Sequence, residues 1–395
     1  MINAGQSALI LIFISYRYTM EEAGVFSIGY AISLLGMTLS KYGQRNFQVT
    51  DANEEFSFAE YRSSRWVTIA VAVLFIFGYM EFQYSMGRYD LGKVIAILLI
   101  FSMKQIDSAE DVYYGMYQQQ GRLDIGAKRY SERLIFSTVL FCFLAICRVP
   151  FILLLLIVVI TSVIVAFFLI RIDAREVIGE KLQATTWKRI VELLRDSFTL
   201  CISSTLTVYI GNMPKYFIDI YLSDNLQARF GYLMMPAFVI MVLSMVIFQP
   251  VIKDMGEAVN AGNKKLLSEY VRKQLIYITV ITIFVLVAGG AFGIPVLNFL
   301  YNTDLSEYWM ELVILFIGGG LYAVSQFMAV PIVSMRKHND IAVIYVFSTI
   351  IAIPIGGWLV ARFAILGASI LYLVINTILT SFLMVDYRIR LTQFS

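Results

Sequence analysis

Residues 91–113 read LGKVIAILLIFSMKQIDSAEDVY, an apolar run that carries Lys104 and Asp107 in its second half. The run is long enough to cross a bilayer, since a membrane helix needs about 20 residues. A charge at mid-membrane costs about 2.5 to 3.5 kcal/mol on insertion scales, so such residues usually face a partner or a wet cavity and mark a transport path. Lys215 and Asp219 repeat the pattern in a second apolar stretch. These charges indicate a transporter and not merely a membrane anchor.

The composition excludes a soluble globular protein. Hydrophobic residues make up 59% of the 395-residue chain and charged residues 15%, against about 25% charged in soluble domains. Mean hydropathy is +0.75. The net charge of +3 is small and no basic tail is present, so we expect no nucleic-acid partner. The three cysteines have neither metal-ligand nor disulfide-framework spacing, so we expect no metal site.

Apolar windows of membrane-spanning length predict an all-α membrane protein with about twelve transmembrane helices. The least obvious window is the fourth, which spans only if it carries Lys104 and Asp107 inward. The expected spans are residues 2–17, 23–43, 66–82, 91–113, 126–147, 150–171, 197–221, 227–250, 274–300, 309–335, 341–361 and 365–387.

The distribution of Lys and Arg predicts the orientation. With a cytoplasmic N-terminus, 23 of the 31 basic residues fall in cytoplasmic segments, Arg65 and Arg133 among them, and six in outside turns. The positive-inside rule therefore favours a multi-pass chain with both termini in the cytoplasm.

The longest polar connection divides the chain into two parallel halves. We expect an N-terminal six-helix bundle at 1–171, a cytoplasmic amphipathic linker at 172–196 and a C-terminal six-helix bundle at 197–395, arranged around a central cavity. The linker carries Trp187 and Leu193 at apolar positions among charges, a pattern typical of an interfacial helix. Because six is even, both halves run in the same direction, as in parallel repeats related by an axis along the membrane normal.

The second charged stretch supplies most of the candidate cavity residues. Lys215 and Asp219 are four apart and share a helix face, where they pair with each other or jointly contact a polar ligand. Pro214 removes a backbone hydrogen bond, so it is a candidate hinge, as is Pro250. The remaining candidates are the polar Asn212 and two deep aromatics that suit stacking on sugar rings, Tyr209 and Tyr216.

Span four supplies a second polar stripe, because Lys104, Asp107 and Asp111 share a face. Glu110 and Asp111 are expected nearer the headgroup region, where charge needs no special explanation. No catalytic constellation accompanies the stripe: the chain has one histidine and no phosphate-binding loop, so we expect no enzyme.

One stretch resembles a known family: GMTLSKYGQRNFQVTD at 36–51, followed by FSF at 56–58 and Tyr61. It is similar to the end of the second helix and the following loop in Wzx-type polysaccharide flippases of the multidrug, oligosaccharidyl-lipid and polysaccharide exporter (MOP) superfamily. Pro214-Lys215 and FQP at 248–250 are similar as well. The likeness extends over the whole chain, although the sequence departs from the family in its abrupt start.

The resemblance implies a function. Such flippases move undecaprenyl-diphosphate-linked oligosaccharide repeat units across the bacterial inner membrane by alternating access, for O-antigen (lipopolysaccharide) or capsule synthesis. It places Gln44 and Arg45 at the cytoplasmic mouth and Lys215 in the cavity. It implies membrane lipids, a polysaccharide polymerase and a chain-length regulator as partners, and no cofactor beyond a coupling proton or sodium ion.

Two other functions remain open at this point. A cation-coupled exporter of drugs or metabolites on the same fold predicts a cavity dominated by acidic residues. A non-transporting scaffold for glycan synthesis predicts no intramembrane charges, so Lys104 and Lys215 argue against it.

Overall fold

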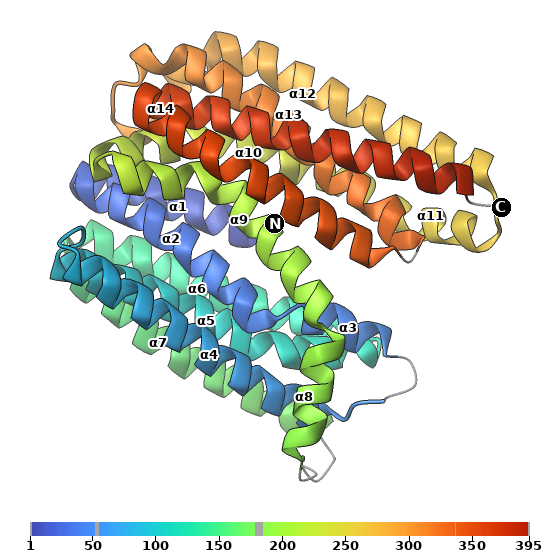
Figure 1. Cartoon of the computed structure of the whole chain (residues 1–395). Coiled ribbons are helices and arrows are strands. Elements are labelled where there is room, and N and C mark those ends of the chain that lie inside the picture. Colours follow the sequence, from blue (N-terminus) through green and yellow to red (C-terminus); the bar gives the residue numbers. More distant parts are fainter. Residues whose placement is uncertain (1, 52–54, 178–184, 336, 394–395) are drawn as a thin grey trace. The chain divides into compact units, whose positions relative to one another are not determined.

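A computed structural model of the chain describes residues 2–51, 55–177, 185–335 and 337–393, and all regular secondary structure in these ranges is helical (Figure 1). The all-α fold class is therefore confirmed. The helices form two compact units, Met1–Val208 and Tyr209–Ser395.

Unit Met1–Val208 is built around α5. This helix packs against five others, α2, α3, α4, α6 and α7, while α1 packs on α2 and α6. Glycine lets α2 approach closely, because a Cβ at Gly36 would lie 2.5 Å from the Phe101 ring. The helices are α1 Ile2–Arg17, α2 Met20–Lys41, α3 Gln44–Thr50, α4 Phe58–Ser85, α5 Leu91–Gln119, α6 Leu123–Ile146, α7 Phe151–Val177 and α8 Trp187–Asp196.

Local signals set the helix ends in this unit. Thr19 begins α2 with a capping box to Glu22, and Ser57 begins α4 with the same motif. The α2 helix stops because Tyr42 and Gly43 both take positive φ, at 54° and 67°. This turn directs the chain into α3 beside α5.

Unit Tyr209–Ser395 is built around α13, which packs against α10, α12 and α14. Three consecutive glycines on α13 allow these contacts. A Cβ at Gly319 would lie 2.7 Å from the Ala237 carbonyl oxygen, and one at Gly320 would lie 2.4 Å from Thr282. The helices are α9 Phe198–Tyr221, which begins in the other unit, α10 Asp224–Phe248, α11 Val251–Asn260, α12 Lys264–Tyr301, the 3-10 helix η1 Ser306–Tyr308, α13 Trp309–Ser334 and α14 His338–Gln393.

Helix α14 is two helices joined at a sharp kink. Ala364 takes φ 48° and ψ −127°, outside helical geometry. Gly367 fits the turn because a Cβ there would lie 2.0 Å from the Leu359 carbonyl oxygen. The two halves correspond to the windows expected at 341–361 and 365–387.

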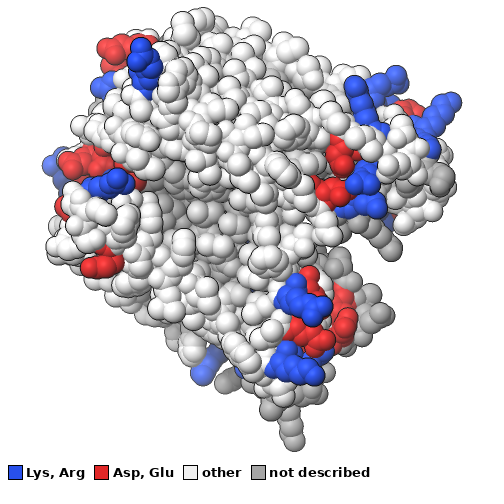
Figure 2. Space-filling model, viewed as in Figure 1, with Lys and Arg blue, Asp and Glu red and all other residues white. Residues whose placement is uncertain are grey.

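All twelve expected windows lie on helices of the structure. Length and hydropathy alone identify seven helices in the described residues as candidate spans. Helices α5, α6 and α9 fall outside these seven and carry several of the charged residues discussed below, among them Lys104, Arg133 and Lys215. Large apolar side chains such as Leu74 and Phe284 are at least 70% exposed, and charges gather at helix ends (Figure 2). Such apolar surface suits lipid and not water.

The connection expected at 172–196 is organised differently from a free interfacial helix. Residues 172–177 continue α7, and residues 178–184 lie outside the described residues. Helix α8 packs on α4: Arg189 Nε donates to Glu60 Oε1 at 3.0 Å, and Leu193 is fully buried. Trp187 is 64% exposed, so only one of the two apolar positions faces the protein.

The boundary between the units falls inside α9 and not before residue 197. The first turns of α9 pack against the α2–α3 turn, where a Cβ at Gly43 would lie 2.7 Å from Leu200. The N-terminal part of α9 therefore belongs to the first unit.

Candidate functional site

The first candidate site is a buried set of charges on α5. Lys104, Asp107, Glu110 and Asp111 are each at most 4% exposed. They divide into two clusters with different partners. Glu110 and Asp111, expected nearer the headgroup region without special partners, are both ion-paired inside the helical unit.

The first cluster, here the Lys104 cluster, consists of Lys104, Asp107, Glu110 and Arg133 of α6. Lys104 Nζ lies 3.1 Å from Asp107 Oδ2, and Arg133 Nε lies 2.8 Å from Glu110 Oε2. Arg133 also bonds Asp107, which it shares with Lys104. Two cations face two carboxylates, so the cluster is neutral. Its members hold α5 and α6 together inside the unit.

The Lys104 cluster continues into a neutral polar path. Lys104 Nζ donates to Gln6 Oε1 at 3.4 Å, and Gln6 Nε2 donates to Ser137 Oγ at 3.2 Å. The Lys104 ammonium also lies 5.0 Å from the Tyr30 ring centroid, a cation–π distance. Lys104 is thus contacted by side chains from α1, α2 and α5.

The second cluster, here the Asp111 cluster, places three cations around one carboxylate. Asp111 lies 3.2 Å from Arg65, 3.5 Å from Lys41 and 3.5 Å from Arg45. Arg65 is buried, whereas the side chains of Lys41 and Arg45 are 27% and 35% exposed. Three positive charges against one negative leave a surplus of two. A cationic surplus beside solvent favours an anionic ligand.

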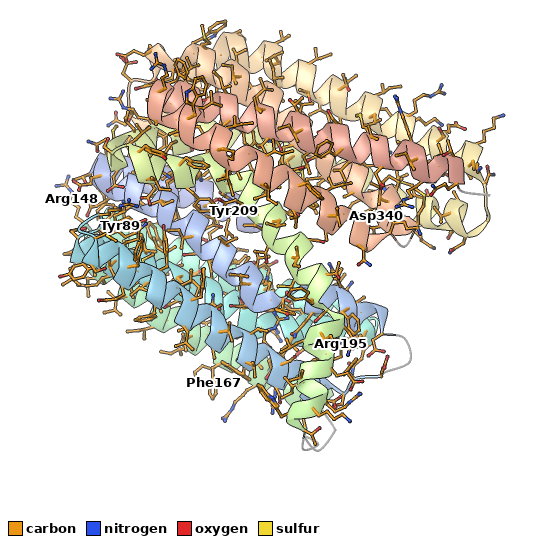
Figure 3. The ribbon with its side chains drawn as sticks, in the orientation of Figure 1. Tyr89, Arg148, Phe167, Arg195, Tyr209 and Asp340 are labelled. Carbon is orange, nitrogen blue, oxygen red and sulfur yellow. The ribbon has the colours of Figure 1, made fainter. Side chains whose placement is uncertain are left out.

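The second candidate site is one face of α9. Tyr209, Asn212, Lys215, Tyr216 and Asp219 fall within about 120° of the helix circumference at 3.6 residues per turn. The rings of Tyr209 and Tyr216 stack, with centroids 5.3 Å apart and planes 15° apart. Figure 3 labels Tyr209 on this helix.

Lys215 is the exceptional residue on this face. It is only 7% exposed. Within the described residues, no ion pair or hydrogen bond to its ammonium group is found, and none joins it to Asp219. The alternative of a self-neutralised Lys215–Asp219 pair is therefore not what the structure contains. A buried charge without a counter-ion is strongly unfavourable, so an anionic ligand would stabilise it.

Comparison with known proteins identifies the fold. No family model and no curated protein matches the sequence. An inward-facing multidrug resistance MATE family transporter of the MOP superfamily matches with TM-score 0.73 at 11% identity, covering 100% of this chain and 95% of that one. An outward-facing structure matches at 0.65 and 13%, covering 100% and 93%. The chain has the MATE fold.

A third match concerns the charge of the binding pocket. A MOP superfamily transporter from Pyrococcus furiosus, described as having a binding pocket of reverse polarity that suggests a different function, matches with TM-score 0.65 at 13% identity. It covers 100% of this chain and 93% of that one. Transporters with the MATE fold thus exist in inward- and outward-facing states, and one is described as having a pocket of reverse polarity.

On this MATE fold, three site residues were missed by sequence reasoning: Lys41, Arg65 and Arg133. All three were assigned to cytoplasmic segments, but Arg65 and Arg133 are 1% and 2% exposed. A signal existed for Arg133, which lies inside the expected fifth span. No signal pointed to Arg65, because it sits just before the apolar window of α4.

The remaining predicted residues are Pro214, Pro250, Gln44 and Arg45. Pro214 lies inside α9 and leaves the Ile210 carbonyl without its usual donor. Pro250 is the N-cap of α11, directly after α10. Gln44 begins α3 and is 1% exposed, and both polar atoms of its side chain lack a partner among the described residues. Arg45, next to it, also donates to Gln118 at 3.1 Å.

In the described ranges, no group of three or more His, Cys, Asp or Glu could hold a metal ion. The Asp111 cluster suits binding of an anion by lysine and arginine. Lys215 suits binding of an anion beside the stacked rings of Tyr209 and Tyr216.

Proposed function

We propose that this chain is a flippase that moves undecaprenyl-diphosphate-linked oligosaccharide repeat units across the bacterial inner membrane by alternating access. The observation that carries the proposal is Lys215, a buried lysine with no counter-ion among the described residues. A diphosphate supplies the missing negative charge, and charge-assisted hydrogen bonds to phosphate are strong. The MATE fold supplies the transport framework.

Two further features support an oligosaccharide carried on a diphosphate. The stacked Tyr209 and Tyr216 lie on the Lys215 face and offer aromatic surface to sugar rings. The Asp111 cluster carries a cationic surplus that includes the half-exposed Arg45. We propose that Gln44 and Arg45 form the cytoplasmic mouth and that the α9 face lines the cavity, whereas Lys104 and Asp107 are paired inside the first unit.

The remaining parts of the proposal follow from that cargo. Both termini are cytoplasmic, and Pro214 and Pro250 act as hinges. The bundles 1–171 and 197–395 form the two halves, except that the first turns of α9 pack with the first half. A proton or sodium ion couples transport, and the polysaccharide polymerase and chain-length regulator of O-antigen or capsule synthesis act next to it.

The main competitor is a cation-coupled exporter on the same fold. It requires surplus acid in the cavity to hold cations. The two clusters on α5 are neutral or cationic, which favours an anionic cargo. The reverse polarity described for the Pyrococcus furiosus transporter supports the idea that pocket charge on this fold follows the cargo.

Reconstituted transport tests the proposal. Purified protein is placed in proteoliposomes with a fluorescent undecaprenyl-diphosphate oligosaccharide, and an impermeant quencher reports the accessible fraction with and without ion gradients. Wild type should move the lipid. Lys215→Ala should slow movement about tenfold or more, since a hydrogen bond to a charged group contributes about 1.5 to 3 kcal/mol.

Two variants control this experiment. Lys215→Arg keeps the cation and should retain part of the rate, and Lys265→Ala removes an exposed lysine and should leave it unchanged. A transport rate of Lys215→Ala close to that of wild type would refute the proposed role of Lys215. If the protein moves none of several glycans but exports dyes under an ion gradient, it is the cation-coupled exporter. If neither lipid movement nor dye efflux is detected, the non-transporting scaffold is the better description.

A further inference from the structure

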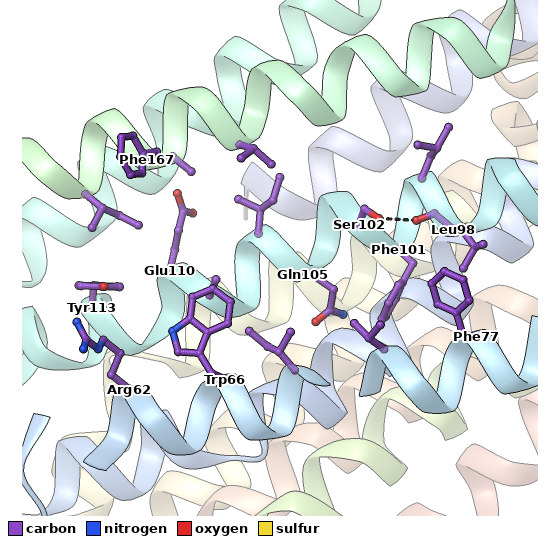
Figure 4. A pocket seen from close by; sticks show the side chains of 18 of the residues that line it. Arg62, Trp66, Phe77, Leu98, Phe101, Ser102, Gln105, Glu110, Tyr113 and Phe167 are labelled. Atoms are coloured by element: carbon purple, nitrogen blue, oxygen red, sulfur yellow. Dashed lines mark hydrogen bonds between the residues drawn. The ribbon is translucent and has the colours of Figure 1, made fainter. Parts of the chain in front are cut away.

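A long groove runs along one flank of the unit Met1–Val208. Helices α4 and α7 both pack on α5 and leave between them a cavity of about 1260 Å³, floored by α5. Figure 4 shows Arg62, Trp66 and Tyr113 at one end and Phe77 and Leu98 at the other. Glu110 of the Lys104 cluster is one of the lining residues.

The shape and lining of the groove suit a hydrocarbon chain. Most of the lining is apolar, with Trp66, Phe77, Leu98 and Phe167 on its walls and floor. Arg62 and Phe77 are fifteen positions apart on α4, about 22 Å along a helix at 1.5 Å per residue. Half the hydrocarbon core of a bilayer is about 15 Å thick. The groove is therefore long enough for a chain that comes from a single leaflet.

One end of the groove is cationic. Arg62 stands near the start of α4 and Arg171 near the end of α7, and both line the groove at the same end because the two helices run in opposite directions. The Arg171 guanidinium lies 4.4 Å from the Phe167 ring centroid. No ion pair for either arginine is found within the described parts of the chain. The acidic lining residue, Glu110, is already neutralised by Arg133 at 2.8 Å.

We propose that the groove binds an anionic phospholipid of the cytoplasmic leaflet. Its phosphate lies between Arg62 and Arg171, and one acyl chain lies along α5 toward Phe77. Basic pockets between membrane helices on the cytoplasmic side are suited to anionic lipid headgroups. The charge bias of the chain puts the arginine end on that side. Binding of this phospholipid does not depend on which substrate the protein transports.

Trp66 allows a direct test, because it lines the groove, is 59% exposed and is one turn from Arg62. A full-length variant with the other three tryptophans changed to Phe is reconstituted in phosphatidylcholine vesicles. Brominated phosphatidylglycerol or brominated phosphatidylcholine is then titrated in, and bromine quenches tryptophan on contact. Half-maximal quenching should need about tenfold less of the anionic lipid.

Three further variants separate headgroup recognition from chain binding. Arg62→Gln with Arg171→Gln should abolish the preference, while Lys188→Gln with Arg195→Gln, an equal charge loss on the exposed face of α8, should keep it. Val73→Phe, which narrows the groove, should reduce quenching by both lipids.

The proposal is overturned by equal quenching by the two lipids in wild type. A preference that survives in the Arg62 and Arg171 variant, or that is lost in the Lys188 and Arg195 variant, overturns it too. If undecaprenyl phosphate displaces the brominated lipid at a lower mole fraction than phosphatidylglycerol does, the occupant is the isoprenoid carrier and the assignment to phospholipid is wrong.

Discussion

Replacing Arg133 by leucine should strongly destabilise the first unit. Arg133 is 2% exposed and bonds both Asp107 and Glu110. Its loss leaves two buried carboxylates with Lys104 as the only remaining cation of the cluster. Removing one partner of a buried ion pair typically costs about 3 to 5 kcal/mol, because an uncompensated charge stays buried.

A matched control lies one turn away on the same helix. Arg129 pairs with Glu132 at 3.0 Å, but these side chains are 23% and 40% exposed. Solvent-exposed pairs contribute about 0 to 1 kcal/mol. Arg129→Leu should therefore have little effect. The two variants remove the same group from one helix, once from a buried cluster and once from a partly exposed pair.

Reversible unfolding in mixed detergent micelles, followed by circular dichroism, measures the two free energies of unfolding. A second variant restores charge balance: Arg133→Leu with Glu110→Gln leaves the Lys104–Asp107 pair and should recover about half the loss. If Arg133→Leu falls within about 1 kcal/mol of Arg129→Leu, the Lys104 cluster does not stabilise the unit and the reasoning fails.

Two further predictions concern packing and the cationic cluster. Gly319→Ala should lower the free energy of unfolding by about 1 to 3 kcal/mol, because its Cβ would lie 2.7 Å from a backbone oxygen, whereas Gly290→Ala, with open space around it, should be neutral in the same assay. Asp111→Asn should destabilise by about 3 kcal/mol, because buried Arg65 loses its carboxylate. Unfolding equal to wild type would show that Arg65 is stabilised elsewhere, for example by the Ser40 carbonyl at 3.0 Å.

The buried charges have different consequences for function. The Lys104 cluster is neutral and its charges are paired, as expected of a cluster that stabilises the packing of α5 on α6. The Asp111 cluster has surplus positive charge and partial exposure, and Lys215 is buried without a counter-ion among the described residues. The last two are therefore the better places to test for an anionic cargo.

The sequence by itself determined the membrane fold class and the places of all twelve helical windows. Hydrophobicity is a local property, and a run of about 20 apolar residues must form a helix in lipid to satisfy its backbone. The sequence also singled out Lys104, Asp107 and Lys215, because charge inside an apolar run is visible without knowledge of neighbours.

Only the tertiary structure decided which charges are paired. Arg133 meets Asp107 across 26 positions, and Arg65 meets Asp111 across 46. Such contacts depend on how α4, α5 and α6 pack, which spacing along one helix cannot reveal. For the same reason Lys215 and Asp219 share a helix face as expected and yet form no ion pair with each other. The sequence shows which charged residues are available for ion pairs, whereas the packing of the helices determines which ion pairs form.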